Sequence, residues 1–333
     1  MKTQIKRFLL TLGFMTRIPV NVNLGEVKDE DMHKGFLYYP VVGLILGLCD
    51  MAVFLLVSLI LPEVFGILFA MLANLCLTGA FHLDGLSDTA DGIYSARTRE
   101  RMLEIMKDSR IGTNGAVAMC FDLALKFAGI YYSDIRWLMI LLMPIAGKMV
   151  QGAIVYKAIY PREKGIGIYV GTVSLGTVIG TVILGLIAMV LAFSYWGILI
   201  FAILFGFAYL FRVYITGKIG GITGDVMGAG SELAEVLLLL VVITLTKYTG
   251  MVPLSLLFLK YKCREISAEG EMIMTLEEAI KKIQPLDEEA MEYTRARWNT
   301  LGKPLHSLGR LEEMVTQFAG IYRDKKPHLG KKA

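Results

Sequence analysis

Residues 36–61 read FLYYPVVGLILGLCDMAVFLLVSLIL, and this stretch decides the fold class. A helix needs about 20 mostly apolar residues to cross a hydrocarbon core of roughly 30 Å, and this run provides them. The composition agrees, because 55% of the 333 residues are hydrophobic and only 19% are charged. Ordinary soluble domains contain about 25% charged residues. The sequence therefore predicts a membrane protein.

Further apolar runs follow along the chain and are interrupted by polar segments. They are Val64–Phe81, Gly115–Tyr132, Trp137–Tyr156, Tyr169–Phe193, Trp196–Thr216 and Leu233–Leu259. The N-terminal segment, residues 1–20, has a basic start and a short, interrupted apolar stretch, which is typical of an interfacial helix and not of a signal peptide. We expect an all-α, polytopic bundle of roughly six to seven transmembrane helices.

The basic residues predict which side each loop faces. If the basic N-terminus stays in the cytoplasm, segments 81–114, 157–168 and 217–231 face the cytoplasm, and residues 133–136 and 194–195 face outward. The polar loops then share one side of the cytoplasmic (inner) membrane. Gly250 and Pro253 are placed to break the last run, which leaves the side of the C-terminal tail open.

Charge and cysteine content exclude two other classes. The net charge of +4 is modest and its basic residues are dispersed, so we expect no nucleic-acid partner. The four cysteines show no CxxC spacing, which argues against a zinc site or a disulfide framework.

The first polar segment that carries chemistry is GAFHLDGLSDTADGIYSA, residues 79–96. Asp84, Asp88 and Asp91 are spaced i, i+4 and i+7, so in a helix their carboxylates share one face. Three carboxylates there predict a Mg²⁺ site, completed by substrate phosphates. The alternative is a helix cap and a solvated first turn. His82 is either a general base, a partner of the site or an interfacial side chain.

The second segment is MKDSRIGTNGA, residues 106–116, directly before an apolar run. Arg110 has the planar fork that grips phosphate, and Thr113 lies in a glycine-rich loop suited to backbone contacts with a substrate. A structural turn entering a membrane helix uses similar residues, so both readings stay open.

The third segment, residues 217–235, contains Asp225 and Glu232, which share one face of a helix, with Glu235 turned partly aside. Acidic residues leading into an apolar run indicate a water-filled cavity or a metal. All three segments face the cytoplasm in this topology and are expected to converge. Carboxylates, an arginine and glycine loops together favour Mg²⁺-dependent phosphoryl or nucleotidyl transfer over transport.

Several of these segments resemble one family. FHLDGLSDTADGI, SRIGTNG and GGITGDVMGAGSELAE, with FMTRIPV and YYPVVGLILG near the start, are similar to the cobalamin synthases, the adenosylcobinamide-GDP ribazoletransferases. The resemblance implies that α-ribazole, or its 5′-phosphate, attacks adenosylcobinamide-GDP and releases GMP. It implies that Asp84, Asp88 and Asp91 hold Mg²⁺, that one of them or His82 takes the proton, and that Arg110, Thr113, Asp225 and Glu232 contact the substrate. A CDP-alcohol phosphotransferase and a corrinoid permease are the alternatives.

The tail resembles a second family. Residues 275–328, and LGKPLHSLGRLEEM above all, are similar to the N-terminal segment of nicotinate-nucleotide–dimethylbenzimidazole phosphoribosyltransferase. A membrane domain of residues 1–262 and a helical tail of residues 263–333 are expected. The tail lacks that family's catalytic portion and is expected not to catalyse; it either recruits the phosphoribosyltransferase of the same pathway or is a remnant without function.

Overall fold

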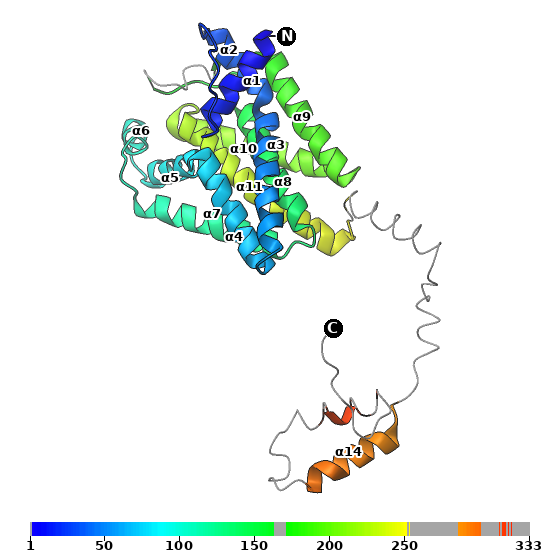
Figure 1. The fold of residues 1–333 in the computed structure, drawn as a ribbon. Helices are drawn as coiled ribbons and strands as arrows, with labels where there is room; N and C mark the ends of the chain where they lie inside the picture. Colours follow the sequence, from blue (N-terminus) through cyan, green and yellow to red (C-terminus); the bar gives the residue numbers. More distant parts are fainter. Residues whose placement is uncertain are drawn as a thin grey trace. The chain divides into compact units, whose positions relative to one another are not determined.

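A computed structural model describes residues 2–162, 171–251, 253, 286–300, 313, 315–317, 319 and 321. The chain divides into two compact units, Met1–Lys260 and Tyr261–Ala333. Within the described residues all regular secondary structure is helical (Figure 1), which confirms the predicted all-α fold.

The first unit contains twelve described helical elements, including one 3₁₀ turn. They are α1 (Lys2–Met15), α2 (Asp29–Gly35), the 3₁₀ turn η1 (Phe36–Tyr38), α3 (Tyr39–Ser58), α4 (Glu63–Thr78), α5 (Phe81–Tyr94), α6 (Arg99–Ile105), α7 (Thr113–Tyr131), α8 (Arg136–Ile154), α9 (Leu175–Phe193), α10 (Trp196–Ile219) and α11 (Gly224–Thr249). The described helix of the second unit is α14 (Glu288–Thr300).

The described residues contain five helical segments long and apolar enough to cross a membrane: Asp29–Ser58, α8, α9, α10 and α11. The bent pair of α4 and α5 makes a sixth if it is counted as one span. The apolar run at Gly115–Tyr132 became α7, which is not among these candidates and carries the charged residues Asp122 and Lys126. The polytopic helical bundle of a multi-pass membrane protein is thus confirmed.

The chain turns sharply between α4 and α5, by 85°. Gly79 and Ala80 both have left-handed backbone conformations, with φ of 64° and 55°, so the helix cannot continue through them. Phe81, which the sequence placed at the end of a membrane span, therefore begins a new helix. The turn directs α5 away from the axis of α4.

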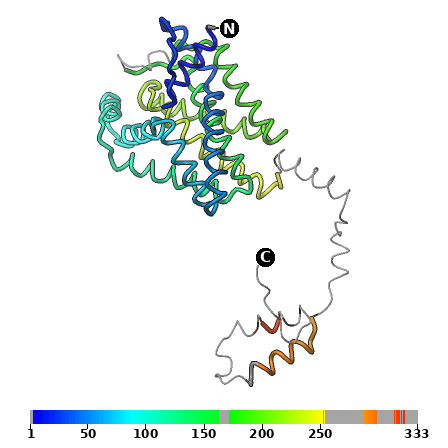
Figure 2. The backbone as a smooth tube through the Cα atoms, viewed as in Figure 1, coloured from blue at the N-terminus to red at the C-terminus, as the bar shows by residue number. Residues whose placement is uncertain are grey.

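Helix α8 packs against α3, α9, α10 and α11. Figure 2 draws the backbone of these helices as a tube. The contact between α8 and α3 is close because Gly43 and Gly47 face α8. A Cβ atom on Gly47 would lie 2.2 Å from the carbonyl oxygen of Leu141. This glycine pair, four residues apart, is the small-residue spacing that allows membrane helices to approach closely.

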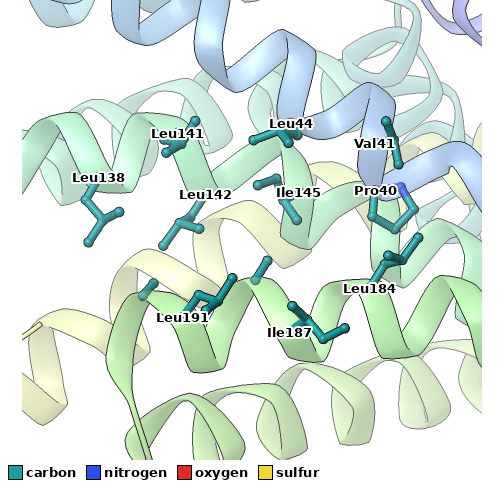
Figure 3. A pocket seen from close by; sticks show the side chains of 12 residues that line it. Pro40, Val41, Leu44, Leu138, Leu141, Leu142, Ile145, Leu184, Ile187 and Leu191 are labelled. Atoms are coloured by element: carbon teal, nitrogen blue, oxygen red, sulfur yellow. The ribbon is translucent and has the colours of Figure 1, made fainter. Parts of the chain in front are cut away.

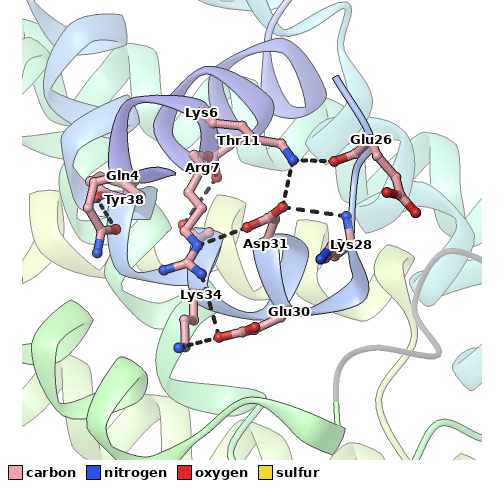
Figure 4. Close-up of polar contacts among 11 residues, drawn as sticks. Gln4, Lys6, Arg7, Thr11, Glu26, Lys28, Glu30, Asp31, Lys34 and Tyr38 are labelled. Atoms are coloured by element: carbon pink, nitrogen blue, oxygen red, sulfur yellow. Dashed lines mark hydrogen bonds and ion pairs between the residues drawn. The ribbon is translucent and has the colours of Figure 1, made fainter. Parts of the chain in front are cut away.

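The N-terminal helices are joined by a polar cluster (Figure 4). Asp31 of α2 is 5% exposed, accepts a hydrogen bond of 3.0 Å from Nε of Arg7 and lies 2.9 Å from Nζ of Lys6. These contacts fix α1 against α2. The predicted N-terminal helix is therefore present, and ion pairs to α2 and apolar contacts with the core hold it in place.

Helix α11 ends at Thr249, and Gly250 follows with a φ of 65°, so the helix ends where Gly250 was expected to break the last run. Much of the predicted helical tail of residues 263–333 lies outside the described residues. The described α14 lies within this tail and is helical, as expected.

Candidate active site

Helices α5 and α11 pack closely at two glycines. A Cβ atom on Gly85 would lie 2.6 Å from the carbonyl oxygen of Asp225, and one on Gly228 would lie 2.9 Å from that of His82. Because neither glycine has a side chain, the first turns of the two helices lie in contact. The first and third polar segments of the sequence are thus brought together.

The aspartates of α5 lie on one helical face, as their spacing predicted. Asp84 is exposed and Asp88 is half-buried, and neither carboxylate has a hydrogen-bond or ion-pair partner in the part of the chain that the structure describes. Asp88 interacts electrostatically with Asp84, Asp91 and Asp225. Because Asp84 and Asp88 have no described partners, their carboxylates are available to bind a cation or accept a proton.

Asp91 is placed differently, because it binds the N-terminus of α7. Its Oδ2 accepts a hydrogen bond of 2.7 Å from the amide of Gly112, and its Oδ1 accepts one of 2.8 Å from the amide of Gly115. The first amides of a helix lack intrahelical partners, so a carboxylate from another helix satisfies them here. This contact joins the first polar segment to the second.

Arg162 contributes a cation to the site that the sequence reading did not single out. Its Nη2 donates a hydrogen bond of 2.8 Å to Oδ2 of Asp225, near the start of α11. It also acts electrostatically on Asp88. Asp225 is held further by the hydroxyl of Thr223, which lies 3.3 Å from its Oδ2. The only signal in the sequence was a basic residue in a loop expected on the same side.

His82 does not join the aspartate face. Helical geometry of 3.6 residues per turn places it about 200° around α5 from Asp84. Its side chain is 2% exposed, and its Nε2 has no hydrogen-bond partner among the described residues. His82 instead interacts electrostatically with Lys126 and Lys148, which lie inside the bundle.

Arg110 and Thr113 lie at the exposed approach to α7. The guanidinium of Arg110 pairs with Asp108, with Nη2 2.6 Å from Oδ2, and it holds the pKa of that carboxyl down to about 2. Both members are therefore charged at neutral pH. Thr113 is the first residue of α7 and is exposed. The predicted phosphate ligand Arg110 thus has a carboxylate partner on the surface.

Glu232 lies in a separate, buried ionic cluster between α7 and α11. It forms an ion pair with Nζ of Lys126, which also lies 2.9 Å from Oε2 of Glu235 and 3.1 Å from Oδ2 of Asp122. All four residues are buried. The structure therefore gives Glu232 a lysine partner and does not bring it to the aspartates of α5.

A second buried lysine adjoins this cluster. Nζ of Lys148 on α8 lies 3.1 Å from Oγ of Ser231, and Lys148 interacts electrostatically with Glu235 and Asp50. Asp50 in turn accepts a hydrogen bond of 2.6 Å from Asn74. The sequence held a signal for these residues, because charged side chains inside apolar runs are rare unless they pair or serve a function.

The carboxylates of α5 suit one mode of Mg²⁺ binding. Within the described residues, no group of three Asp, Glu, His or Cys side chains could by itself hold a metal ion. Mg²⁺ usually takes only one or two carboxylates together with water and substrate phosphates. Asp84 and Asp88, with unpaired oxygens, fit that mode, whereas the oxygens of Asp91 already accept amide hydrogen bonds.

Of the cavities lined by described residues, two are larger than the one of about 20 Å³ beside Asp50. One, of about 370 Å³, lies between α3, α8 and α9 and is lined only by apolar side chains, among them Leu44, Leu142 and Ile187 (Figure 3). The other, of about 260 Å³, lies between α5, α7, α10 and α11 and includes Thr89 and Asp122. Neither includes Asp84 or Asp88, so the aspartate face is not part of these cavities.

A bundle of apolar helices with carboxylates along one face of α5, an adjacent arginine and a capped helix terminus is suited to phosphate-ester chemistry. Residues 7–243 match the cobalamin-5-phosphate synthase family. The chain belongs to this family, as its sequence motifs indicated.

Relatives agree with this assignment. The adenosylcobinamide-GDP ribazoletransferase of Clostridium novyi is 38% identical over 72% of this chain and 97% of its own length. The enzyme of Clostridioides difficile is 36% identical over 71% of this chain and 96% of its own length. The enzyme of Alkaliphilus metalliredigens is 40% identical over 74% of this chain and 98% of its own length.

The tail matches a second family, because residues 283–333 are similar to a phosphoribosyltransferase family. The predicted resemblance of the tail is thereby confirmed. No solved structure is significantly similar to the chain.

Proposed function

We propose that this chain joins adenosylcobinamide-GDP to α-ribazole or its 5′-phosphate with release of GMP, the last assembly step of cobalamin biosynthesis. The observation that carries the proposal is that Asp84 and Asp88, two carboxylates without described partners, adjoin the ion pair of Arg162 and Asp225. The chain that holds them belongs to the cobalamin-5-phosphate synthase family. Carboxylates and a guanidinium next to one another serve a reaction between a hydroxyl and a diphosphate.

The reaction forms one P–O bond and breaks another. The hydroxyl oxygen of the acceptor attacks the phosphorus on the cobinamide side, and the bond from that phosphorus to the bridging oxygen breaks. The bond's electron pair leaves with GMP. The hydroxyl proton passes to a carboxylate oxygen of Asp84 or Asp88, which are open to the solvent side of α5, unlike the buried His82.

We assign Asp84 and Asp88 as the residues that would hold Mg²⁺ together with the substrate diphosphate. The ion would supply electrostatic stabilisation of the negative charge that develops on the leaving phosphate. Asp91 keeps the N-terminus of α7 in place beside this site through its two amide hydrogen bonds.

The deciding experiment uses the purified full-length chain in detergent with Mg²⁺, adenosylcobinamide-GDP and α-ribazole phosphate. A cobalamin product and an equal amount of GMP are expected. A CDP-alcohol phosphotransferase would instead release CMP from a CDP-alcohol and leave adenosylcobinamide-GDP intact. A corrinoid permease would take up corrinoid into proteoliposomes without releasing GMP.

We further propose that the site faces the cytoplasm of the cell that makes the protein, in its inner membrane. The support is the charge of the loops, because Arg97, Arg99, Arg101 and Arg110 all lie in the segment between α5 and α7 or in α6. The nucleotide-bearing substrate and GMP then exchange with the cytoplasmic pool.

A further inference from the structure

Arg162 connects segments from three parts of the chain. It follows α8 in sequence, and its Nη2 donates to Asp225 at the start of α11. The same nitrogen lies 3.5 Å from the carbonyl oxygen of Met106, the residue that caps the C-terminus of α6. A side chain held from two directions presents its remaining donors in a fixed orientation, which lowers the entropy lost when they bind a ligand.

One donor of this guanidinium is buried and unused. Nε of Arg162 has no hydrogen-bond partner in the described ranges, although it is shielded from solvent. The side chain as a whole is 11% exposed. A buried N–H without an acceptor is costly, and native structures seldom retain one unless a ligand or water supplies the acceptor.

The charge around Arg162 is predominantly negative. Asp88 interacts with it electrostatically, and Asp225 is the carboxylate that pairs with it directly. Asp84 acts electrostatically on both of these carboxylates. A diphosphate that approached these carboxylates would be repelled unless cations compensated for them. Arg162 is the guanidinium that acts on Asp88, whereas Arg110 pairs with Asp108 at the surface.

From these contacts we infer that Arg162 binds the diphosphate of the nucleotide-bearing substrate, and that Asp225 is a positioning residue that aims the guanidinium. The inference rests on the proposed function. Nη2 keeps its bond to Asp225, and Nε donates to a phosphate oxygen on the GMP side of the scissile bond. A planar guanidinium supports both contacts because its donors lie in one fixed fork.

The test measures KM separately for the two substrates in the full-length protein. In Arg162→Gln the KM for adenosylcobinamide-GDP rises by about 10- to 100-fold, the range expected for loss of a hydrogen bond to a charged group. The KM for α-ribazole phosphate stays unchanged. Arg101→Gln is the matched control, because Arg101 is 63% exposed and pairs with Glu104 on α6. Its KM values match those of wild type.

A second comparison separates ligand binding from a structural ion pair. If Arg162 served only to neutralise Asp225, the double variant Arg162→Gln/Asp225→Asn would recover the wild-type KM, and that recovery would overturn the inference. If Arg162 binds the diphosphate, the double variant is no better than Arg162→Gln. Arg162→Lys, which keeps the charge but not the fork, gives an intermediate KM and remains measurable should the glutamine variant fold poorly.

Inorganic pyrophosphate serves as a probe that is independent of turnover. We expect wild type and Arg101→Gln to bind it equally by calorimetry, and Arg162→Gln to bind it at least tenfold more weakly. Equal binding by all three overturns the inference. If wild type binds pyrophosphate through Arg162 but forms no cobalamin product, the proposed reaction fails while the diphosphate site stands.

Discussion

The Oδ1 atom of Asp91 accepts a hydrogen bond of 2.8 Å from the amide of Gly115, a residue on a different helix. Together with the bond from Gly112, it makes Asp91 the cap of α7. We therefore expect Asp91→Ala to lower the unfolding free energy by about 1–2 kcal/mol, the usual cost of removing a helix cap. The measurement is the thermal unfolding temperature in detergent. Asp84→Ala is the control, since Asp84 has no partner to lose; equal unfolding temperatures would contradict a capping role.

The two unpaired aspartates are expected to control turnover and not folding. Asp84→Asn and Asp88→Asn should each lower the rate of GMP release by about 10²- to 10⁴-fold, because each removes a charge that binds the metal or accepts the proton. Chelation of Mg²⁺ should abolish the same activity in wild type. The amount of each variant in the membrane fraction, measured by cell fractionation, should equal that of wild type. A variant with normal activity at limiting Mg²⁺ would exclude that carboxylate as a ligand.

The buried lysine of α7 is expected to control stability. Lys126→Met leaves Asp122, Glu232 and Glu235 without their shared ammonium group, and breaking a buried ion pair in this way costs about 3–5 kcal/mol. Size-exclusion chromatography and thermal unfolding should show loss of folded protein. Adding Glu232→Gln to Lys126→Met should restore part of it. If Lys126→Met were as stable as wild type, the three carboxylates would have to be neutral in the absence of the lysine.

The C-terminal unit is expected to be dispensable for catalysis. The chain divides near Lys260, so a protein truncated after Lys262 should retain the rate of GMP release. Loss of activity in the truncated protein would show that the predicted domain boundary is wrong. If the tail recruits the phosphoribosyltransferase of the pathway, only full-length protein will capture it from solution; equal capture by both proteins would favour a remnant without function.

The orientation of the site is testable by cysteine labelling in a variant without the four native cysteines. Single cysteines at Thr98, Ile111 and Lys218 are exposed and should react with a membrane-impermeant reagent only from the cytoplasmic side. Asp134→Cys, in the exposed turn between α7 and α8, should react only from outside. A cytoplasmic-side residue that reacts solely from outside would rule out the proposed topology.

Periodicity and composition were sufficient for the helical class and for the shared face of Asp84, Asp88 and Asp91. They did not show the bend at Gly79 and Ala80, because apolar residues continue across it and only the backbone conformation interrupts the run. The second role of Asp91 was also hidden, since a bond to Gly115 spans 24 residues and depends on how two helices pack. A short sequence motif does not predict a partner that lies so far along the chain.

The pairing of Arg162 with Asp225 was unpredictable for the same reason, at a separation of 63 residues. Arg110 was the more obvious phosphate ligand because it lies in a glycine-rich motif, yet Asp108, two residues earlier, pairs with it. The buried lysines were detectable in principle, as charges inside apolar runs. Asp122, Lys126 and Lys148 belong to no local polar motif, so their pairing depends on how α7, α8 and α11 pack.

The ion pair between Lys126 and Glu232 has a consequence for the order in which the protein is made. Glu232 is synthesised 106 residues after Lys126, which at about 5–20 residues per second is a delay of roughly 5–20 s. Among the described carboxylates that pair with Lys126, Asp122 is the one made before α11, and a buried ammonium group without sufficient counter-charge is costly. Because two of the three carboxylates that pair with Lys126 come from α11, we expect α7 to reach its buried position only after α11 has been made.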